Sequence, residues 1–493
     1  MTTKILINAI DPDECRIAIV KNSKLEGFHI ESTTHEITHG NIYKGIVSRV
    51  EPGLQAVFVD YGAPRHGFLQ KNEIHTDYFQ DTADGNHSLK NVIKRGQEVL
   101  VQVTKDPVGN KGAMLTTYIS LAGRYVVLLP GSLNRGISRK IEEGDERSRI
   151  KAIFDSLRIS DGFGVIIRTA SENTTKTRLQ KDIRDLSRIW RDIRKNAMKE
   201  TVPALVYKEQ GLIFRSIRDY FTNDVTEILI DNLILFRELK DFISIFSPKH
   251  AKVVRLHKEG KPIFTKHQLE DQITSVFENR VLLKSGGSIV IEPTEALVSI
   301  DVNSGKGTHK TSIEQTAFRS NLEAVEEIAR QLRLRDLGGL IVIDFIDMKD
   351  RKHKLDVEKA LKTAIKEDRA RIKIGSLSRF GLLEMSRQRL RPPVGYGSFS
   401  VCPECQGKGQ VASIEMLGLA FLRKLQLETL KEEICHVRGK LPTRVADYLL
   451  NRKRRELAEL EERRNLTIEI EGIAAMHPRD SEIICEKEEK SSL

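Results

Sequence analysis

Three polar residues stand where two apolar stretches of the sequence end. Asp301 and Asn303 follow the run ALVSI, and Asp344 follows the run GLIVI. Two carboxylates and an amide, with no pair of histidines nearby, suit a hard cation such as Mg²⁺, which keeps its other coordination positions for water and phosphate. Asp347 is a further candidate ligand. The alternative is that these aspartates cap loops or pair with surface arginines.

The two apolar stretches predict strands, and the segment between them predicts a helix. The strands are rich in β-branched residues, and residues 312–332 place apolar side chains on one helical face. A crossover helix of this kind joins parallel neighbours. We therefore expect Asp301 and Asp344 to lie side by side at one edge of a sheet, with Asn303 on the same side of its strand as Asp301.

Cys402 and Cys405 lie in the motif CPECQGKG, which has the spacing of a zinc knuckle. Zinc takes four ligands, and the three other cysteines are isolated, so the remaining ligand pair most simply comes from a second copy of the chain. A chaperone-type CxxCxGxG domain is the rival interpretation, but it normally repeats the motif four times. Five cysteines are too few for a disulfide framework, and we expect reduced thiols.

Residues 40–117 are dense in short strands with Gly-rich bends, a pattern that predicts a small closed barrel of the oligonucleotide-binding (OB) type. Phe58 and Phe68 flank the loop DYGAPRHG, where their rings could stack on unpaired bases. Lys105 and Lys111 could contact the backbone of the same nucleic acid. The alternative is that both phenylalanines belong to the barrel core.

The remaining segments are predicted more coarsely. The first strands form a meander that cannot bury its own faces, so we expect it to dock on residues 215–280. A basic segment follows the acidic site, and we expect it to form a continuous surface that holds phosphate. Its cations are Arg369, Arg371, Lys373, Arg379, Arg387, Arg389 and Arg391.

The composition favours a polyanionic partner. The chain of 493 residues is long enough for three or more domains, and its 80 Lys and Arg against 69 Asp and Glu give a formal charge of +11. No apolar run approaches the roughly 20 residues that a membrane span needs, and the opening residues lack the apolar core of a signal peptide. We expect a soluble, cytoplasmic protein without a membrane span.

Several motifs, in their order along the chain, resemble those of the ribonuclease E/G family. GNIYKGIVSRVEPGLQAVFVDYGAPRHGFL resembles its RNA-binding barrel, and IDVNSGKG, GLIVIDFIDM, SRFGLLEMSRQRLRP and CPECQGKG resemble its nuclease core. The resemblance covers nearly the whole chain. In length the sequence is more similar to the ribonuclease G branch, because it lacks the long disordered scaffold that follows the nuclease in the ribonuclease E branch.

The resemblance implies a multidomain fold with α/β and β parts. An OB-type RNA-binding barrel is expected within a ribonuclease-H-like subdomain, followed by a DNase-I-like α/β nuclease domain, a zinc-link and a small α/β domain. The expected segments are ribonuclease-H-like 1–37 and 215–280, barrel 38–118, 5′-end sensor 119–214, catalytic domain 281–400, zinc-link 401–412, dimerisation domain 413–476 and disordered tail 477–493.

The resemblance also implies a pocket for an RNA 5′-monophosphate, formed by Arg168, Thr169 and Arg371. Arginine and threonine together offer charge, planar donors and a hydroxyl to a phosphate. An ordinary surface arginine is the alternative reading of Arg168. The family further implies a homodimer, or a dimer of dimers, linked by the shared zinc.

These observations predict a magnesium-dependent endoribonuclease that cleaves single-stranded RNA. Asp301 and Asp344 would bind Mg²⁺ with the help of Asn303, and the products would carry a 5′-phosphate and a 3′-hydroxyl. The family implies roles in rRNA and tRNA processing and in mRNA decay. The alternative is a non-catalytic RNA-binding, zinc-linked assembly factor.

Overall fold

The fold was analysed in a computed structural model, which divides into one unit of residues 1–396 and another of residues 397–493. The structure describes residues 2–32, 38–79, 89–107, 111–138, 140–141, 144–222, 224–246, 248–305, 312–391, 393–395, 399–431 and 434–487.

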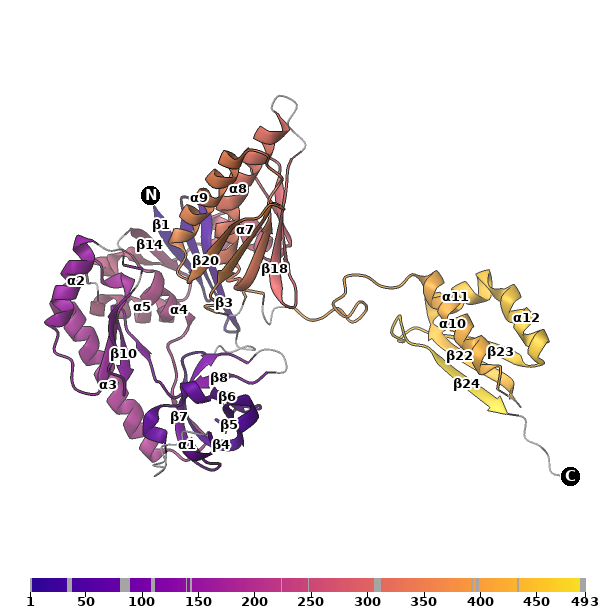
Figure 1. Ribbon diagram of the computed structural model, residues 1–493, viewed down its shortest axis with the longest axis horizontal. Coiled ribbons are helices and arrows are strands. Elements are labelled where there is room, and N and C mark those ends of the chain that lie inside the picture. Colours follow the sequence, from indigo (N-terminus) through magenta and orange to yellow (C-terminus); the bar gives the residue numbers. More distant parts are fainter. Residues whose placement is uncertain are drawn as a thin grey trace. The chain divides into compact units, whose positions relative to one another are not determined.

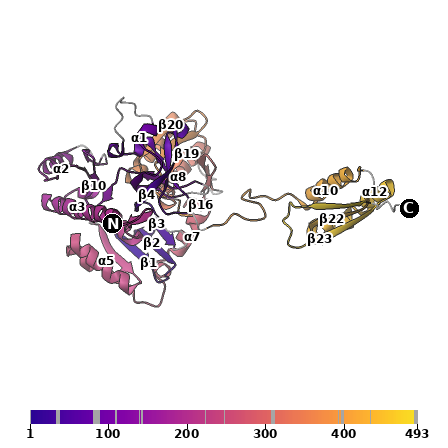
Figure 2. The ribbon, with the colours of Figure 1, turned by 90° about the horizontal axis from the view of Figure 1, so that it is seen from below.

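The N-terminal meander is completed by strands that come more than 200 residues later. Its strands β1 (Thr3–Asn8), β2 (Glu14–Lys21) and β3 (Lys24–Ser32) run side by side (Figure 2). β1 also pairs in parallel with β14 (Val225–Ile230), which pairs with β15 (Val254–Leu256). The predicted docking of the meander on residues 215–280 is therefore confirmed.

Both faces of this five-stranded sheet are covered, which explains the nearly continuous apolar run of β1. Ile5 and Ile7 pack against the helices α4 (Leu212–Tyr220) and α5 (Leu233–Phe246). Leu6 faces the opposite way and packs in a cluster with Phe264. One strand thus contributes to two separate cores.

Residues 42–116 form the predicted barrel. The strands are β4 (Ile42–Glu51), β5 (Ala56–Asp60), β6 (Gly67–Gln70), β7 (Glu98–Lys105) and β8 (Met114–Thr116). They pair in the order β4-β5-β6-β8-β7, and an additional pairing of β7 with β4 closes the barrel. β13 (Ala204–Tyr207) adds to the outside of β4.

The next part combines a four-stranded sheet with two helices. The sheet has the order β11-β12-β10-β9, made of β9 (Leu121–Ala122), β10 (Val126–Pro130), β11 (Arg135–Ile137) and β12 (Phe163–Ile167). The helices α2 (Asp145–Asp155) and α3 (Lys176–Lys199) contribute Phe154 and Leu179 to its core.

The acidic residues lie on a six-stranded sheet with the order β16-β17-β18-β19-β21-β20. Its central strands are β17 (Ser288–Pro293), β18 (Leu297–Asn303), β19 (Gly339–Asp344) and β21 (Leu382–Arg387), and its outer strands are β16 (Arg280–Leu282) and β20 (Ile372–Leu377). The helices α8 (Ile313–Leu334) and α9 (Arg351–Ala364) lie together on one face of it (Figure 1). Residues of β18 and β19 alternate between buried and accessible positions, so the other face is open.

The second unit contains a three-stranded sheet with the order β23-β22-β24. It is made of β22 (Ile434–Pro442), β23 (Thr467–Ile473) and β24 (Glu482–Lys487), and the helices α10 (Ile414–Glu428), α11 (Thr443–Arg452) and α12 (Arg454–Arg464) contribute to its core. The prediction of a disordered tail over residues 477–493 is wrong for β24, which pairs antiparallel with β22. The polar residues of this edge strand gave no clear strand pattern in the sequence.

Candidate functional site

The predicted acidic pair is brought together by strand register. β18 and β19 are parallel neighbours, and Asp301 is the register partner of Asp344. Ile300 and Ile343, one residue earlier in each strand, are buried against α8 and α9. Because successive side chains of a strand alternate between faces, both carboxylates are held on the open face of the sheet. Their predicted adjacency is confirmed.

Asn303 lies on the same face as Asp301, as expected. Its side-chain amide donates a hydrogen bond of 2.7 Å to Oδ2 of Asp301. This bond orients one oxygen of the Asp301 carboxylate. Lys306 and Gly307, which belong to the motif IDVNSGKG, lie outside the described residues.

The electrostatics of the acidic site favour a cation. Partial burial raises the pKa of Asp344, and the negative charges of Asp301 and Asp347 raise it further. Among the described neighbours that shift this pKa there is no cation that would offset the repulsion. The interpretation of these residues as partners of surface arginines therefore finds no support in the described part of the chain.

The donor set fits a Mg²⁺ ion that keeps several of its water ligands. Asp301 and Asp344 offer two exposed carboxylates from rigid strands, and Asp347 lies close enough to act on Asp344. Over the described residues, no group of three or more His, Cys, Asp or Glu side chains is arranged to enclose a metal ion. Two carboxylates are nevertheless what Mg²⁺ commonly takes from a protein.

Two residues of α8 that were not predicted hold the loop after β19. The buried side chain of Asn321 donates 2.8 Å to the carbonyl of Ile346 and accepts 3.0 Å from its amide. Glu314 accepts bonds from the amides of Lys349 and Asp350, which lower the pKa of Glu314 to about 2 together with a bond from His353. In the sequence, the signal for this role was a polar residue, Asn321, on an otherwise apolar helix face.

Phe58 and Phe68 lie on the outer surface of the barrel and not in its core. They are register partners on β5 and β6, and their rings meet edge to face with centroids 5.7 Å apart. The core residues Val57 and Val59 alternate with Phe58 and point inward. The core interpretation of the two phenylalanines is therefore wrong.

Strand register extends this aromatic pair into a row across the barrel. Arg49 pairs with Phe58, Phe68 with Met114, and Met114 with Lys105. The guanidinium of Arg49 lies 4.6 Å from the centroid of the Phe58 ring. The row thus places two rings between two cations, as expected of a surface that stacks bases and attracts phosphates.

Lys111 is exposed beside the same surface. The next residue, Gly112, approaches the loop before β6 so closely that a Cβ there would lie 2.2 Å from the carbonyl oxygen of His66. Only glycine permits this contact. The contact holds Lys111 close to the start of the strand that carries Phe68.

Arg168 directly follows β12, and it already has a carboxylate partner. Its guanidinium forms a 2.6 Å ion pair with Asp219 and donates 2.6 Å to the carbonyl of Gly123. Burial alone would raise the pKa of Asp219, but Arg168 and Arg218 lower it to about 2. Thr169 is exposed next to Arg168.

Arg371 is exposed one residue before β20, and no recorded contact in the described residues joins it to Arg168. Lys140 connects the two regions, because its ammonium donates to the carbonyls of Asp368 and Ala370. Burial lowers the pKa of Lys140, while Asp368 raises it and the nearby Arg371 contributes to lowering it. A positively charged region therefore lies where the part that contains the β11-β12-β10-β9 sheet meets the six-stranded sheet.

The predicted continuous basic surface is only partly formed. Arg387 points into the core of the six-stranded sheet, where it pairs with the buried Asp368 and Asp336. Arg369 stacks over the ring of Tyr220 at 3.9 Å, and Arg391 donates to His29. The prediction fails for Arg387 because this residue continues the inward-facing series of Leu383 and Met385 on β21, so its side chain enters the core.

The knuckle in the second unit has the local geometry of a thiolate site. The backbone amides of Gly409 and Gly407 donate to the sulfur of Cys405 and lower the pKa of its thiol, and the side chain of Cys402 also contributes. Gly407 and Gly409 have φ of +82° and +71°, which turns these amides inward. The pair fits zinc, whose thiolate ligands must be deprotonated.

Three family models match the chain. Residues 120–390 match the "Ribonuclease E/G family", residues 401–488 match "RNase E/G, Thioredoxin-like domain" and residues 36–117 match "S1 RNA binding domain". The S1 match coincides with the closed barrel. The thioredoxin-like match includes both the knuckle and the three-stranded sheet of the second unit.

Curated relatives cover nearly all of the chain. Ribonuclease E of Haemophilus influenzae is 48% identical over 476 residues, which are 96% of this chain and 51% of that protein, and ribonuclease E of Escherichia coli K12 is 47% identical over 94% of this chain and 44% of that protein. The chain thus spans about half the length of these relatives. Ribonuclease G of Haemophilus influenzae is 36% identical over 86% of this chain and 87% of that protein.

The described helices include none with the length and apolarity that crossing a membrane requires.

Proposed function

Because this chain belongs to the ribonuclease E/G family, we propose that it is an endoribonuclease that cleaves single-stranded RNA with the help of Mg²⁺. The observation that carries the proposal is the pairing of Asp301 with Asp344 on the open face of a sheet, with Asn303 bonded to Asp301. An acid pair that no described cation neutralises, in a protein with an RNA-binding barrel, is well suited to bind the metal and then the phosphate.

In this proposal each polar residue has a distinct role. Asp301 and Asp344 hold Mg²⁺, and Asn303 fixes the orientation of the Asp301 carboxylate. The chemistry that Mg²⁺ supplies when bound is the activation of water for in-line attack on the phosphodiester and the neutralisation of charge on the phosphate. Asn321 and Glu314 act as positioning residues, because they hold the loop between Asp344 and α9.

The barrel supplies affinity for the substrate. Phe58 and Phe68 stack on unpaired bases, while Lys105 and Lys111 lie next to them and attract the backbone. This arrangement favours single-stranded RNA, because a base in a duplex does not offer its face to a ring.

Arg168, Thr169 and Arg371 are proposed to recognise a 5′-monophosphate. The ion pair of Arg168 with Asp219 supports this proposal, because the same guanidinium could pair with the oxygens of a phosphate. The proposal requires a phosphate to compete with Asp219 for Arg168, and Lys140 adds positive charge between Arg168 and Arg371. Sensing of this kind would favour RNA that has already been cleaved once.

The wider assignments follow from family membership. We propose that the sheet containing β1 and β14 is ribonuclease-H-like, that the six-stranded sheet is DNase-I-like, and that Cys402 and Cys405 share one zinc with a second chain in a homodimer or dimer of dimers. We further propose a cytoplasmic enzyme of rRNA and tRNA processing and mRNA decay.

Cleavage of an internally labelled single-stranded RNA tests the central proposal. We expect cleavage with Mg²⁺, none with EDTA, and none with Asp301→Asn or Asp344→Asn, while RNA binding persists in both variants. Asp192→Asn, an exposed acid on α3, is the matched control and should cleave normally. Near-normal turnover by either site variant would disprove the metal assignment, and binding without cleavage by the wild type would favour the assembly-factor alternative.

The products distinguish the mechanism. Metal-activated water does not need the 2′-hydroxyl of the substrate, so a 2′-O-methyl sugar at the scissile position should still permit some cleavage. The expected ends are a 5′-phosphate and a 3′-hydroxyl. A 2′,3′-cyclic phosphate among the products would exclude this mechanism.

A further inference from the structure

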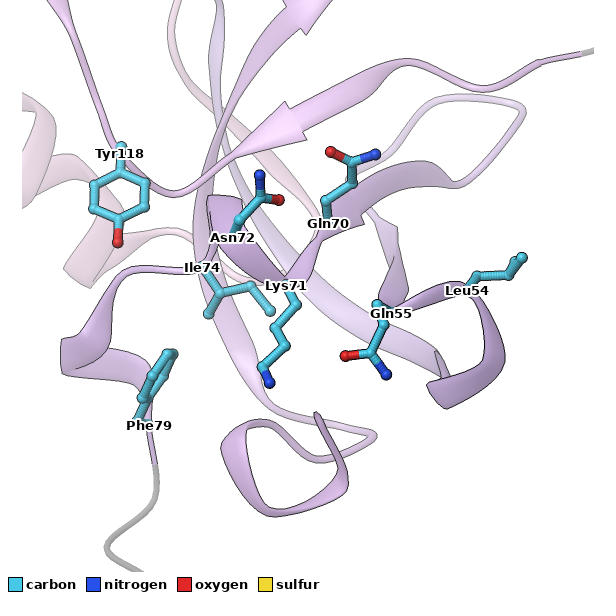
Figure 3. Close-up of a pocket in the computed structure, with 8 residues that line it drawn as sticks. All are labelled: Leu54, Gln55, Gln70, Lys71, Asn72, Ile74, Phe79 and Tyr118. Atoms are coloured by element: carbon cyan, nitrogen blue, oxygen red, sulfur yellow. The ribbon is translucent and has the colours of Figure 1, made fainter. Parts of the chain in front are cut away.

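A second concave surface of the barrel is not used by the aromatic row. It is a pocket of about 560 Å³ lined by Leu54, Gln55, Gln70, Lys71, Asn72, Ile74, Phe79 and Tyr118. Figure 3 shows Phe79 and Tyr118 along one side, Leu54 and Gln55 on the opposite side, and Lys71 between them. We call it the Tyr118 pocket.

The lining combines the groups that recognise a nucleotide. Ile74 is 1% exposed and forms an apolar floor, while the ring of Tyr118 is 40% exposed and accessible to a partner. The amides of Gln55, Gln70 and Asn72 can both donate and accept, as the edge of a base requires. Among the described residues of the lining, Lys71 supplies the single positive charge, which suits one phosphate.

The pocket is continuous with the aromatic row. Gln70 comes two residues after Phe68 on β6, so the two side chains project from the same face about 7 Å apart along the strand. Ala56 is the register partner of Gln70, two positions along the ladder from the pairing of Phe58 with Phe68. A single strand stacked on Phe58 and Phe68 therefore reaches the pocket with its neighbouring nucleotides.

The wall that carries Tyr118 is fixed before any ligand binds. The ring of His75 lies 5.1 Å from the ring of Tyr118. A hydrogen bond from the His75 amide to the Thr117 hydroxyl, and one between its Nε2 and the carbonyl of Gly131, hold His75 in place. The amide of Lys71 donates to the carbonyl of Gln55, which joins the two sides of the pocket. A preformed wall lowers the entropic cost of binding.

We propose that the Tyr118 pocket is an additional subsite for one nucleotide of single-stranded RNA, with Tyr118 and Phe79 contacting the base and Lys71 its phosphate. The inference rests on the proposed function of the barrel as the substrate-binding domain. It extends the RNA-binding surface around the end of β6, away from the Lys105 end of the row.

Binding by the full chain in EDTA, where the proposed cleavage cannot occur, tests the subsite. Fluorescence anisotropy with a labelled single-stranded RNA should show roughly 5- to 100-fold weaker binding for Tyr118→Leu, because stacking on one ring is lost. Tyr118→Phe keeps the ring and should bind like wild type. Lys71→Gln should weaken RNA binding and reduce the salt dependence of the affinity. The control is Lys94→Gln, which makes the same charge change at an exposed lysine outside the pocket and should alter binding much less.

Photocrosslinking of wild-type protein to RNA carrying 5-iodouridine gives an independent readout that needs no variant to fold. An adduct on Tyr118 or Phe79, in addition to adducts on Phe58 or Phe68, is expected. Absence of that adduct, or unchanged affinity of a folded Tyr118→Leu variant, would overturn the subsite. If Phe58→Ala also left binding unchanged, the proposed role of the whole barrel would fail, and the two failures are thereby distinguished.

Discussion

At the scale of single residues, the acid pair shows how strand register brings distant carboxylates together in one site. Asp301 and Asp344 are 43 positions apart in the numbering of the chain but become direct neighbours, and Asp347 adds a third negative charge. Without a cation this arrangement opposes folding, because the folded state brings like charges together. Electrostatic repulsion therefore destabilises the folded, metal-free site, and a bound metal ion relieves it.

Asp344→Asn should consequently raise the Tm of the metal-free protein slightly at neutral pH. The pKa of Asp344 is raised in the folded state, so its ionisation destabilises the fold fully above that pKa and not at all below the unfolded value. The difference between variant and wild type should disappear on acidification. Thermal unfolding in EDTA at several pH values measures it.

Added Mg²⁺ provides the control for this prediction. It should raise the Tm of the wild type and have little effect on Asp344→Asn, because only a folded site with both carboxylates binds the ion well. A variant that is stabilised by Mg²⁺ as strongly as the wild type would show that Asp344 is not a ligand.

Arg168→Ala should slow cleavage of a 5′-monophosphorylated RNA roughly tenfold or more but hardly alter that of the same RNA with a 5′-hydroxyl. Each charged hydrogen bond lost is worth about 1.5–3 kcal/mol. Rates for both substrates in variant and wild type decide the question. Arg178→Ala, an exposed arginine on α3, is the control, and a preserved preference for the monophosphate in Arg168→Ala would mean that Arg168 serves only its pair with Asp219.

At the scale of elements, β21 shows how a strand can take a charge into the core. Leu383, Met385 and Arg387 all face inward, and Arg387 is 4% exposed. Its guanidinium donates to Asp368, to Asp336 and to the carbonyl of Leu337. It thereby ties β21 to the turn that precedes β19 and to the segment that precedes β20.

Arg387→Met should destabilise the first unit by about 3–5 kcal/mol, since it leaves two buried carboxylates without their cation. A lower urea midpoint for the unfolding of this unit is the measurement. Arg379→Met, at an exposed arginine of the same segment, should change the midpoint by about 0.5 kcal/mol or less. Equal effects of the two substitutions would contradict the structural role of Arg387.

The sequence predicts the elements well where local pattern decides them. The strand, helix and strand around Asp301 and Asp344 follow from alternation and helical spacing, and so does the closed barrel. The pairs Arg168–Asp219 and Arg387–Asp336 could not be predicted, because each joins residues 51 positions apart in different elements. β24 was missed for a related reason: its pairing with β22, and not its own composition, makes it a strand.

At the scale of the whole molecule, the knuckle predicts how chains associate. If Cys402 and Cys405 supply half of a shared site, metal analysis should find close to one zinc per two chains. Cys405→Ser, or removal of zinc by a chelator, should shift the assembly to smaller species in light scattering. Cys435→Ser, outside the knuckle, should retain both zinc and assembly, whereas one zinc per chain would contradict the sharing.

The parallel pairing of β1 with β14 imposes an order on folding during synthesis. The barrel strands β4 to β8 are complete once residue 116 has left the ribosome, whereas β1 must wait for residues 225–230. Until then β1, an apolar strand, has one edge without a hydrogen-bonding partner. Such an exposed edge is a site for association with other nascent chains. A fragment that stops before β14 should therefore aggregate through its first strands although its barrel is folded, and one extended through β15 should not.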